Sequence, residues 1–484
     1  MTRKRLGSTC RAKVNRSASE DNTMTQISRR NSSHIRLINR RQFLAGAAAT
    51  AAFTIVPRHV LGGAKYVAPS EKICLAIIGC GHQGGGIGRH MGNNEMSRVV
   101  ALCDVAMEDQ RTKETREAFP DPPIFRDFRQ MFETMGDDID ACTIGVPDHA
   151  HFPIAMLAMS QGKHIYVEKP LANTFEECEL MIAAEKKYGV ACQMGNQGHS
   201  GNNPMQFKTW VEAGIIKNVK RIDAFMNSGR RWHGWEIDGY PDGEPCPPGM
   251  DWDTWIGTAE MHPYSRRYDP GNWRSWYIYG NGAFGDWGPH ILDTAHRFLE
   301  LGLPTEVEAV KREGPNDYIF PQASTVAFRF PARKNMPACE VTWYDGKRNP
   351  PPRPDCLEPE RNLDRPGKVI YGEDLTFHGG SHGSTLRVIP ESKMKELASS
   401  LPKWPGQSGH HENFLRACRG EEKTNSPFHV SGELTQVFML GVIAQRLGGT
   451  LKFDPQTRRI TNNDLADRML RTPPRQGWES FYRL

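Results

Sequence analysis

Paired cysteines are missing from this sequence. None of its 11 cysteines stands in a Cys-x-x-Cys pair, and the number is odd. Several lie within apolar runs, among them Cys74, Cys103, Cys142 and Cys192. Scattered cysteines of this kind argue against a disulfide framework and against a zinc site. They predict reduced, buried thiols in strands.

A strong excess of charge is also lacking. The formal net charge is +5 over 484 residues, and the first 41 residues hold eleven Lys and Arg against only Glu20 and Asp21. The remainder is therefore slightly acidic, which gives no electrostatic reason to expect a nucleic-acid partner. Hydrophobic residues at 38% and charged residues at 24% are ordinary for a globular protein. The length predicts two or three domains, at roughly 100–200 residues each.

The apolar stretch near the N-terminus is too short for an ordinary membrane span, which takes about 20 residues. It runs from Phe43 to Val56, is rich in small residues, and follows the pair Arg40-Arg41. This layout predicts a twin-arginine export signal within residues 1–63, hence a periplasmic protein that contacts the membrane only if the signal is retained. A buried helix is the alternative. Export after folding accounts for free cysteines, because folding then takes place under reducing conditions.

A glycine-rich loop follows the apolar run Ile73–Ile78, which is typical of a strand buried on both faces of a parallel sheet. In such loops the first glycine permits a tight turn, the second lets the backbone approach a pyrophosphate, and the third allows close helix packing. The N-terminus of the following helix presents free N–H groups to the phosphates. The predicted dinucleotide contacts are Gly79, Gly81, His82, Gln83 and Gly84.

An acidic residue closes the next predicted strand, Val99–Cys103. This residue, Asp104, lies twenty positions after Gly84, where the adenine ribose hydroxyl of a dinucleotide is bound. A carboxylate at that position repels a 2′-phosphate. The two motifs therefore predict NAD as the cofactor and make NADP less favourable. The alternative is a glycine turn that binds no ligand.

Apolar runs continue to alternate as strands and helices after this point. Predicted helices are Met107–Ala118, Ile154–Ser160 and Thr174–Tyr188, and predicted strands are Asp140–Val146, His164–Val167 and Val190–Met194. The alternation predicts a Rossmann domain with a doubly wound parallel sheet over residues 64–194. Ligands bind at the carboxyl ends of such strands. Pro147, Glu168 and Asn196 follow these strands and are therefore predicted cofactor contacts.

Four motifs occur in order along the chain. They are Gly79–Gly84, Pro147-Asp148-His149-Ala150-His151, Glu168-Lys169-Pro170 and Gly280–His290. Together they resemble the glucose–fructose oxidoreductase / inositol dehydrogenase family, known as Gfo/Idh/MocA, over residues 72–480. The resemblance implies an α/β fold with an N-terminal Rossmann domain. It also implies a C-terminal α/β domain over residues 195–484, whose open, mostly antiparallel sheet serves substrate binding and homo-oligomer contacts.

The same resemblance implies roles for single residues. It places Lys169, Asp286 and His290 beside the nicotinamide, and His149 and His151 near the cofactor. Asp286 and His290 stand four positions apart in a predicted helical segment that continues over Ile291–Leu301, so their side chains share one face.

Oxidation of a secondary alcohol needs a base for the hydroxyl proton, and the ordinary pKa of histidine, about 6.5, suits that role. We predict His290 as the base, Asp286 as its orienting or substrate-binding partner, and Lys169 as the group that polarises the oxygen. Lys169 is the base instead if burial depresses its pKa.

Structural roles are the alternatives for these three residues. Lys169 is then a solvated lysine at a strand end, Asp286 a helix cap and His290 a hydrogen-bonded core histidine. A metal site of Asp286, His290, Asp293 and His296 is a further alternative. No other ligand signature supports it, so no metal is predicted.

Tryptophan is concentrated in one part of the chain, with seven of the 11 between Trp232 and Trp287. Aromatic faces stack on sugars, although packing within an insertion accounts for most of these residues. Arg274 and Trp276 are predicted substrate contacts, because they shortly precede Asp286. Residues 345–385 are predicted to form a long irregular loop. Two helices are predicted further on, Glu412–Cys418 and Glu433–Leu447.

The sequence thus predicts an exported NAD-dependent oxidoreductase that transfers a hydride between nicotinamide and a hydroxyl carbon of a sugar, sugar acid or cyclitol. Because an exported enzyme lacks a pool of free nicotinamide, we expect NAD to stay tightly bound and the net chemistry to be redox-neutral. One alternative is an NAD-dependent glycoside-cleaving enzyme that works by transient oxidation and elimination. Another is a non-catalytic sugar-binding protein on the same fold.

Overall fold

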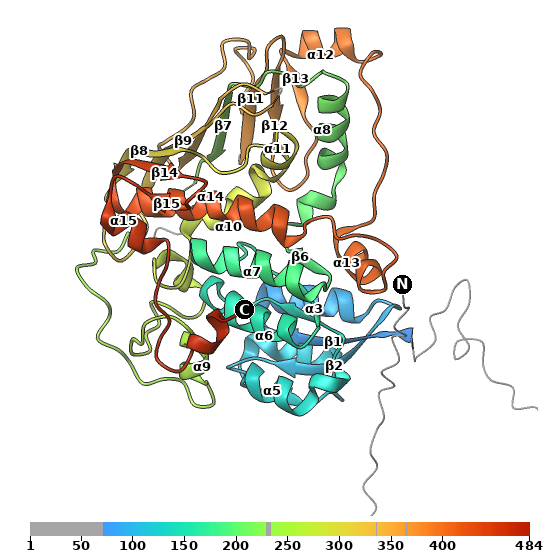
Figure 1. Ribbon diagram of the computed structural model, residues 1–484, viewed down its shortest axis with the longest axis vertical. Coiled ribbons are helices and arrows are strands. Elements are labelled where there is room, and N and C mark those ends of the chain that lie inside the picture. The colour runs from blue at the N-terminus through green and yellow to red at the C-terminus, as the bar shows by residue number, and fades with distance from the viewer. Residues whose placement is uncertain (1–70, 229–233, 335, 364–365) are drawn as a thin grey trace, which may run out of the picture. The chain divides into compact units, whose positions relative to one another are not determined.

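The computed structural model describes residues 71–228, 234–334, 336–363 and 366–484 (Figure 1). The predicted export signal, residues 1–63, lies outside the described residues. Within them, no helix is both long enough and apolar enough to cross a membrane.

Six parallel strands form the first sheet. They are β1 (Ile73–Ile78), β2 (Ser97–Cys103), β3 (Ile124–Phe125), β4 (Ala141–Ile144), β5 (His164–Val167) and β6 (Cys192–Met194), in the order β3-β2-β1-β4-β5-β6. Strand β1 is buried along its whole length, as its continuous apolar run predicts. Cys74, Cys103, Cys142 and Cys192 are buried in these strands. The predicted doubly wound parallel sheet is confirmed.

Helices cover both faces of this sheet. They are α3 (His82–Gly92), α4 (Lys113–Ala118), α5 (Phe128–Met135), α6 (His151–Ser160) and α7 (Phe175–Tyr188). The predicted helix Met107–Ala118 is wrong in its first half. Asp109 accepts a hydrogen bond from the backbone N–H of Arg111 and caps a short 3₁₀ turn, Gln110–Thr112, so the α-helix begins only at Lys113. Strand β3 and helix α5 were not predicted, because β3 has only two residues.

Nine strands of the described residues form the second sheet, which is antiparallel except for one pair among them. The strands are β7 (Arg221–Met226), β8 (Glu306–Glu313), β9 (Ala323–Phe330), β10 (Cys339–Asp345), β11 (Gly367–Tyr371), β12 (Thr376–Gly379), β13 (Arg387–Ile389), β14 (Gly449–Asp454) and β15 (Arg459–Ile460). Their order is β13-β12-β11-β7-β10-β9-β8-β14-β15, and only β7 and β10 run parallel. The predicted α/β fold with an open, mostly antiparallel second sheet is confirmed.

The interpretation of residues 345–385 as an irregular loop is wrong in its second half. Strands β11 and β12 lie there, and β11 pairs with β7 in the middle of the sheet. Val369, Ile370 and Phe377 are fully buried. The short strands between Pro- and Gly-rich turns carry too few residues to show an alternating pattern.

Within the part of the chain that the structure describes, eight further helices accompany the second sheet and the chain that leads to it. They are α8 (Asn202–Glu212), α9 (Trp252–Ile256), α10 (Gly282–Ile291), α11 (Asp293–Phe298), α12 (Glu391–Leu397), α13 (His410–Cys418), α14 (Phe428–Leu447) and α15 (Asp464–Met469). The predicted helices Glu412–Cys418 and Glu433–Leu447 correspond to α13 and α14, which begin a few residues earlier. The predicted continuation Ile291–Leu301 is interrupted at Leu292, between α10 and α11.

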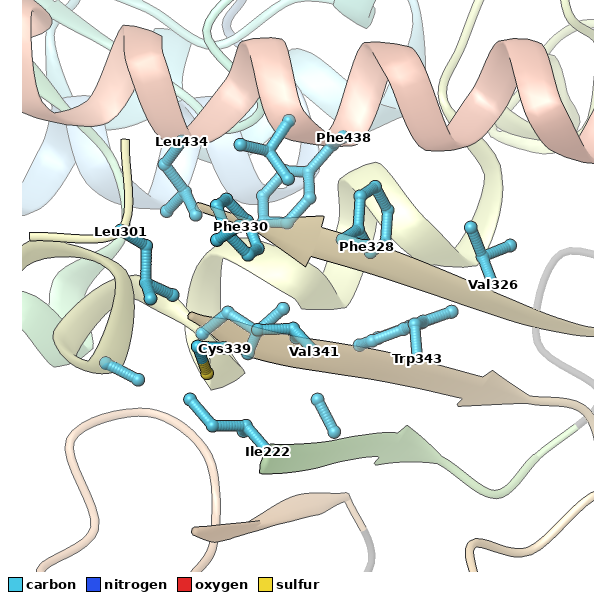
Figure 2. Close-up of a cluster of buried hydrophobic side chains, with 14 of the residues drawn as sticks. Ile222, Leu301, Val326, Phe328, Phe330, Cys339, Val341, Trp343, Leu434 and Phe438 are labelled. Atoms are coloured by element: carbon cyan, nitrogen blue, oxygen red, sulfur yellow. The ribbon is translucent and has the colours of Figure 1, made fainter. Parts of the chain in front are cut away.

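Helix α14 lies between the two sheets, against α7 on one side and against α10, β8 and β9 on the other (Figure 1). Figure 2 shows Leu434 and Phe438 of α14 directed toward Phe328 and Phe330 of β9. All four side chains belong to one buried cluster. Burying each such side chain stabilises the fold by roughly 1.5–3 kcal/mol. This packing fixes α10, which also contacts α14 and β7, close to the carboxyl ends of the parallel strands.

Candidate active site

The glycine loop turns sharply between β1 and α3. Gly79 has a φ of +87°, and a Cβ atom on Gly79 or Gly84 would lie 2.4 Å from the carbonyl oxygen of Gly145. Only glycine permits this backbone conformation and this close approach without strain. Helix α3 begins within the loop at His82, so its first N–H groups face the space in front of the loop.

A cavity of about 760 Å³ lies in front of this loop. It brings together most of the residues that the sequence predicted: Gly79, Gly81, His82, Gln83, Gly84, Asp104, Pro147, Glu168, Lys169, Arg274, Asp286 and His290. The loop and Asp104 come from the first sheet, whereas Arg274, Asp286 and His290 come from the chain that leads into the second sheet and from α10. The cavity therefore lies where the two parts of the fold meet.

Lys169 is held by Asp286. Its Nζ donates hydrogen bonds to the Oδ1 atom of Asp286 at 2.9 Å and to the backbone oxygen of Asp286 at 3.1 Å. Both side chains are largely buried, with exposed fractions of 13% for Lys169 and 5% for Asp286. Asp286 lies inside helix α10, so it is not a helix cap. A lysine and an aspartate paired in this way keep an ammonium group oriented in the cavity.

Arg274 lies between the carboxylate of Asp286 and that of Asp148. Its guanidinium lies 3.2 Å from Asp286 Oδ1 and 3.2 Å from Asp148 Oδ1. Asp148 is fully buried, and its Oδ2 accepts hydrogen bonds from the backbone and the side chain of Asn281. Burial raises the pKa of Asp148, and the charges of Arg274 and Lys169 oppose that effect. Two cations and two carboxylates thus alternate in a chain that starts at the cavity lining and ends at the buried Asp148.

His290 lies on α10 one turn after Asp286 and is 4% exposed. Its Nδ1 atom is buried and has no hydrogen-bond partner among the described residues. The imidazole of His382 stacks on it with ring centroids 3.9 Å apart, and the backbone N–H of His382 donates to the backbone oxygen of His290. Burial holds the pKa of His290 well below its usual range, and the nearby Lys169 and His382 lower it further. His290 is therefore neutral at pH 7 and able to accept a proton.

Glu168 lines the cavity next to Lys169. Burial raises the pKa of Glu168 to about 7, although the charges of Lys169 and Arg274 act in the opposite direction. The amide of Gln197 donates to Glu168 Oε1 at 3.3 Å. This carboxyl group changes its charge close to neutral pH, beside the cation that Asp286 holds.

Four predicted site residues do not line the cavity: His149, His151, Asn196 and Trp276. Both imidazoles are buried against backbone carbonyl oxygens. The amide of Asn196 pairs with Ser426 and Asp293 instead. Trp276 is 0% exposed in a cluster of aromatic side chains. The structure thus places these four residues in the supporting walls, where packing and backbone hydrogen bonds occupy their side chains.

Several cavity residues were not predicted from the sequence: Arg111, Asp269, Trp273, Trp287 and His382. Asp148, which lies behind the cavity lining and pairs with Arg274, is part of the motif that begins at Pro147. No sequence pattern indicated His382, because it follows β12 in a segment that was interpreted as an irregular loop. Among the described residues, no group of three or more His, Cys, Asp or Glu side chains is placed to hold a metal ion.

Comparison with protein families agrees with this architecture. Residues 73–196 match the model for an oxidoreductase family with an NAD-binding Rossmann fold. Residues 201–319 and 368–480 match the model for the C-terminal α/β domain of the same oxidoreductase family. The chain belongs to the Gfo/Idh/MocA family. The resemblance predicted from the four motifs is confirmed.

Individual relatives of this Gfo/Idh/MocA protein are distant. A "Glycosyl hydrolase family 109 protein" of Shewanella pealeana is 26% identical over 221 residues, which cover 42% of this chain and 48% of that protein. The chain thus matches only about half the length of this curated relative.

Among solved structures, the WlbA dehydrogenase of Bordetella pertussis in complex with NADH and UDP-GlcNAcA is 16% identical. Its TM-score is 0.52, and the match covers 79% of this chain and 99% of that one. The aldose-aldose oxidoreductase of Caulobacter crescentus complexed with glycerol is 17% identical, with a TM-score of 0.51, covering 79% and 100%. At these identities the two structures show a shared fold.

Proposed function

We propose that this protein uses NAD to oxidise a hydroxyl-bearing carbon of a sugar, sugar acid or cyclitol. The observation that carries the proposal is a single cavity with the glycine loop and Asp104 at one end and Lys169, Asp286 and His290 at the other. The residues present fit a nicotinamide dinucleotide. The loop has glycine where a Cβ would collide, a helix N-terminus faces the cavity, and a carboxylate ends β2.

When bound, NAD supplies the hydride acceptor, and the chain's own residues handle the proton. We assign proton removal to His290, because its imidazole is neutral and its Nδ1 has no partner among the described residues. We assign polarisation of the substrate oxygen to Lys169, whose ammonium group is oriented by two hydrogen bonds to Asp286. The convergence of these three groups argues against a sugar-binding protein without catalysis.

Tight retention of the cofactor and export are further parts of the proposal. The pair Arg40-Arg41 and the apolar stretch behind it support export by the twin-arginine route. A protein exported in the folded state would carry NAD with it and would run redox-neutral chemistry. The test is to release the nucleotide from natively purified protein and to identify it by mass. NAD at close to one per chain supports the proposal, and protein purified without any nucleotide contradicts it.

A second candidate function shares the same first step. The relative from Shewanella pealeana is named a glycosyl hydrolase family 109 protein. A glycosidase that used NAD transiently would oxidise one sugar carbon, which acidifies the neighbouring C–H bond. It would then eliminate the aglycone, add water to the double bond that forms, and return the hydride to the oxidised carbon. An aryl glycoside distinguishes the two candidates. Release of the phenol without net NADH formation favours glycoside cleavage, whereas oxidation of free sugars without phenol release favours the oxidoreductase.

A further inference from the structure

Arg111 pairs with two carboxylates at the Asp104 end of the cavity, where the adenosine of a bound dinucleotide would lie. Its Nε and Nη2 atoms donate to the two carboxylate oxygens of Asp109 at 2.9 and 3.0 Å. Its Nη1 and Nη2 atoms donate to the two oxygens of Asp269 at 2.9 and 3.0 Å. Paired contacts of this kind are the strongest hydrogen bonds that a guanidinium group forms.

The position of Arg111 relates it to the cofactor loop. A Cβ atom on Gly81 would lie 3.3 Å from the Cβ atom of Arg111, so the arginine lies directly beside the loop. Burial raises the pKa of Asp104, and the charge of Arg111 opposes that effect. Asp104, Asp109, Arg111 and Asp269 all line the same cavity.

An arginine near the end of the second strand is the usual partner of a 2′-phosphate in Rossmann domains that bind NADP. Here its donors already point at Asp109 and Asp269. With Asp104, this end of the cavity holds three carboxylates around one guanidinium. The other arginine that lines this end, Arg126, pairs with Glu108. A doubly charged phosphate would meet excess negative charge and an occupied cation.

We infer that Asp269 is a cofactor-selectivity residue: by occupying Arg111, it makes the adenosine end reject a 2′-phosphate. This inference rests on the proposed use of a nicotinamide dinucleotide. Asp269 is 158 positions from Arg111 and belongs to the chain between α9 and α10, outside the parallel sheet. Selectivity is therefore shared between the Rossmann domain and a segment that follows it in the sequence.

The test is a competition experiment on the purified holoprotein. Wild type and Asp269→Asn are equilibrated with mixtures of NADH and NADPH, and the retained nucleotides are quantified by mass after rapid gel filtration. The amide keeps the size of the carboxylate but removes its charge. We expect the preference for NADH over NADPH to fall by about tenfold or more in D269N, a change equivalent to about 1.4 kcal/mol.

Two variants make the experiment specific. In the double variant Arg111→Ala with Asp269→Asn, the increased retention of NADPH should disappear. The guanidinium that Asp269→Asn frees to bind the 2′-phosphate is then absent. In Asp253→Asn, the preference should stay at the wild-type value. Asp253 lies on α9, before that segment, and pairs with Arg475 without lining the cavity. If D269N does not fold, Asp109→Asn takes its place, since Asp109 is more exposed and holds the other edge of Arg111.

The outcomes distinguish a failure of the role given to Asp269 from a failure of the proposed function. An unchanged preference in a folded D269N, or a gain for NADPH that persists without Arg111, overturns the inference and leaves the proposed function standing. A wild-type protein that retains neither NADH nor NADPH overturns both.

Discussion

The Nζ atom of Lys169 lies 2.9 Å from Oδ1 of Asp286, although the two residues are 117 positions apart. Lys169 follows β5 of the parallel sheet, and Asp286 lies on α10, which packs against α14 and β7. The pair forms only when both parts of the fold are assembled. The cavity chemistry proposed for this chain depends on that assembly.

Replacement of Lys169 by Met is expected to abolish turnover while leaving the nucleotide bound. The ammonium group acts on the substrate oxygen, so its loss should lower kcat by about 10²- to 10⁴-fold. Turnover and nucleotide content, the latter by mass, are measured on the same preparation. Lys163→Met is the matched control, because Lys163 precedes β5 without lining the cavity. Intact turnover in K169M would show that the site is assigned wrongly.

Replacement of Arg274 by Met is expected to destabilise the fold as well as to lower kcat/KM. It leaves Asp148 and Asp286 as buried carboxylates with one cation fewer, which costs about 3–5 kcal/mol. Adding Asp148→Asn should restore part of that loss, because the amide needs no counter-charge. Urea unfolding of wild type, R274M and the double variant measures this recovery. Equal stability of R274M and the double variant would show that the buried Asp148 does not need the charge of Arg274.

In the pH profile of kcat/KM, we expect the loss of activity on the acid side to occur below the usual pKa range of histidine. The base must be neutral, and His290 is neutral above its pKa, which burial, Lys169 and His382 lower. Activity should therefore persist below about pH 6.5, which is the ordinary pKa of histidine. In His382→Asn the acid limb should move to higher pH, because the stacked imidazole that lowers the pKa of His290 is removed. The pH dependence of kcat/KM checks both points, and a limb that stays in place in H382N would rule out the role of the stack.

The sequence predicted the parallel sheet and most of the cavity, because both depend on local pattern. The run Ile73–Ile78, the glycine loop and Asp104 are each readable within a few residues. Lys169, Asp286 and His290 could be placed together only through the family resemblance. No local pattern indicates that Asp286 pairs with Lys169, since long-range packing brings them together.

What the sequence could not show were contacts from irregular segments. His382 reaches His290 from the turn after β12, and Asp269 reaches Arg111 from a stretch without regular structure. Trp276 illustrates the opposite error. Its closeness in sequence to Asp286 indicated a substrate contact, but its indole donates to the backbone oxygen of Arg267 inside an aromatic cluster.

Helix α7 offers a test of the fold that is independent of the active site. Thr174 caps it, and the side chain of Glu177 accepts from the backbone N–H of Thr174 in return. Thr174→Ala should lower the free energy of unfolding by about 1 kcal/mol, because one N–H at the helix start loses its partner. Thr174→Ser keeps the hydroxyl and should lower the free energy of unfolding by less. Urea unfolding compares the two, and equal losses would argue against the capping role.

The most direct measurement is the absorbance of the bound nicotinamide when the holoprotein is mixed with a panel of sugars, sugar acids and cyclitols. We expect at least one carbohydrate to raise the absorbance of reduced nicotinamide within a single turnover in wild type. The same compound should have no effect on K169M. A wild-type protein that holds NAD but shows no change with any carbohydrate, or a K169M variant that responds like wild type, would contradict this expectation.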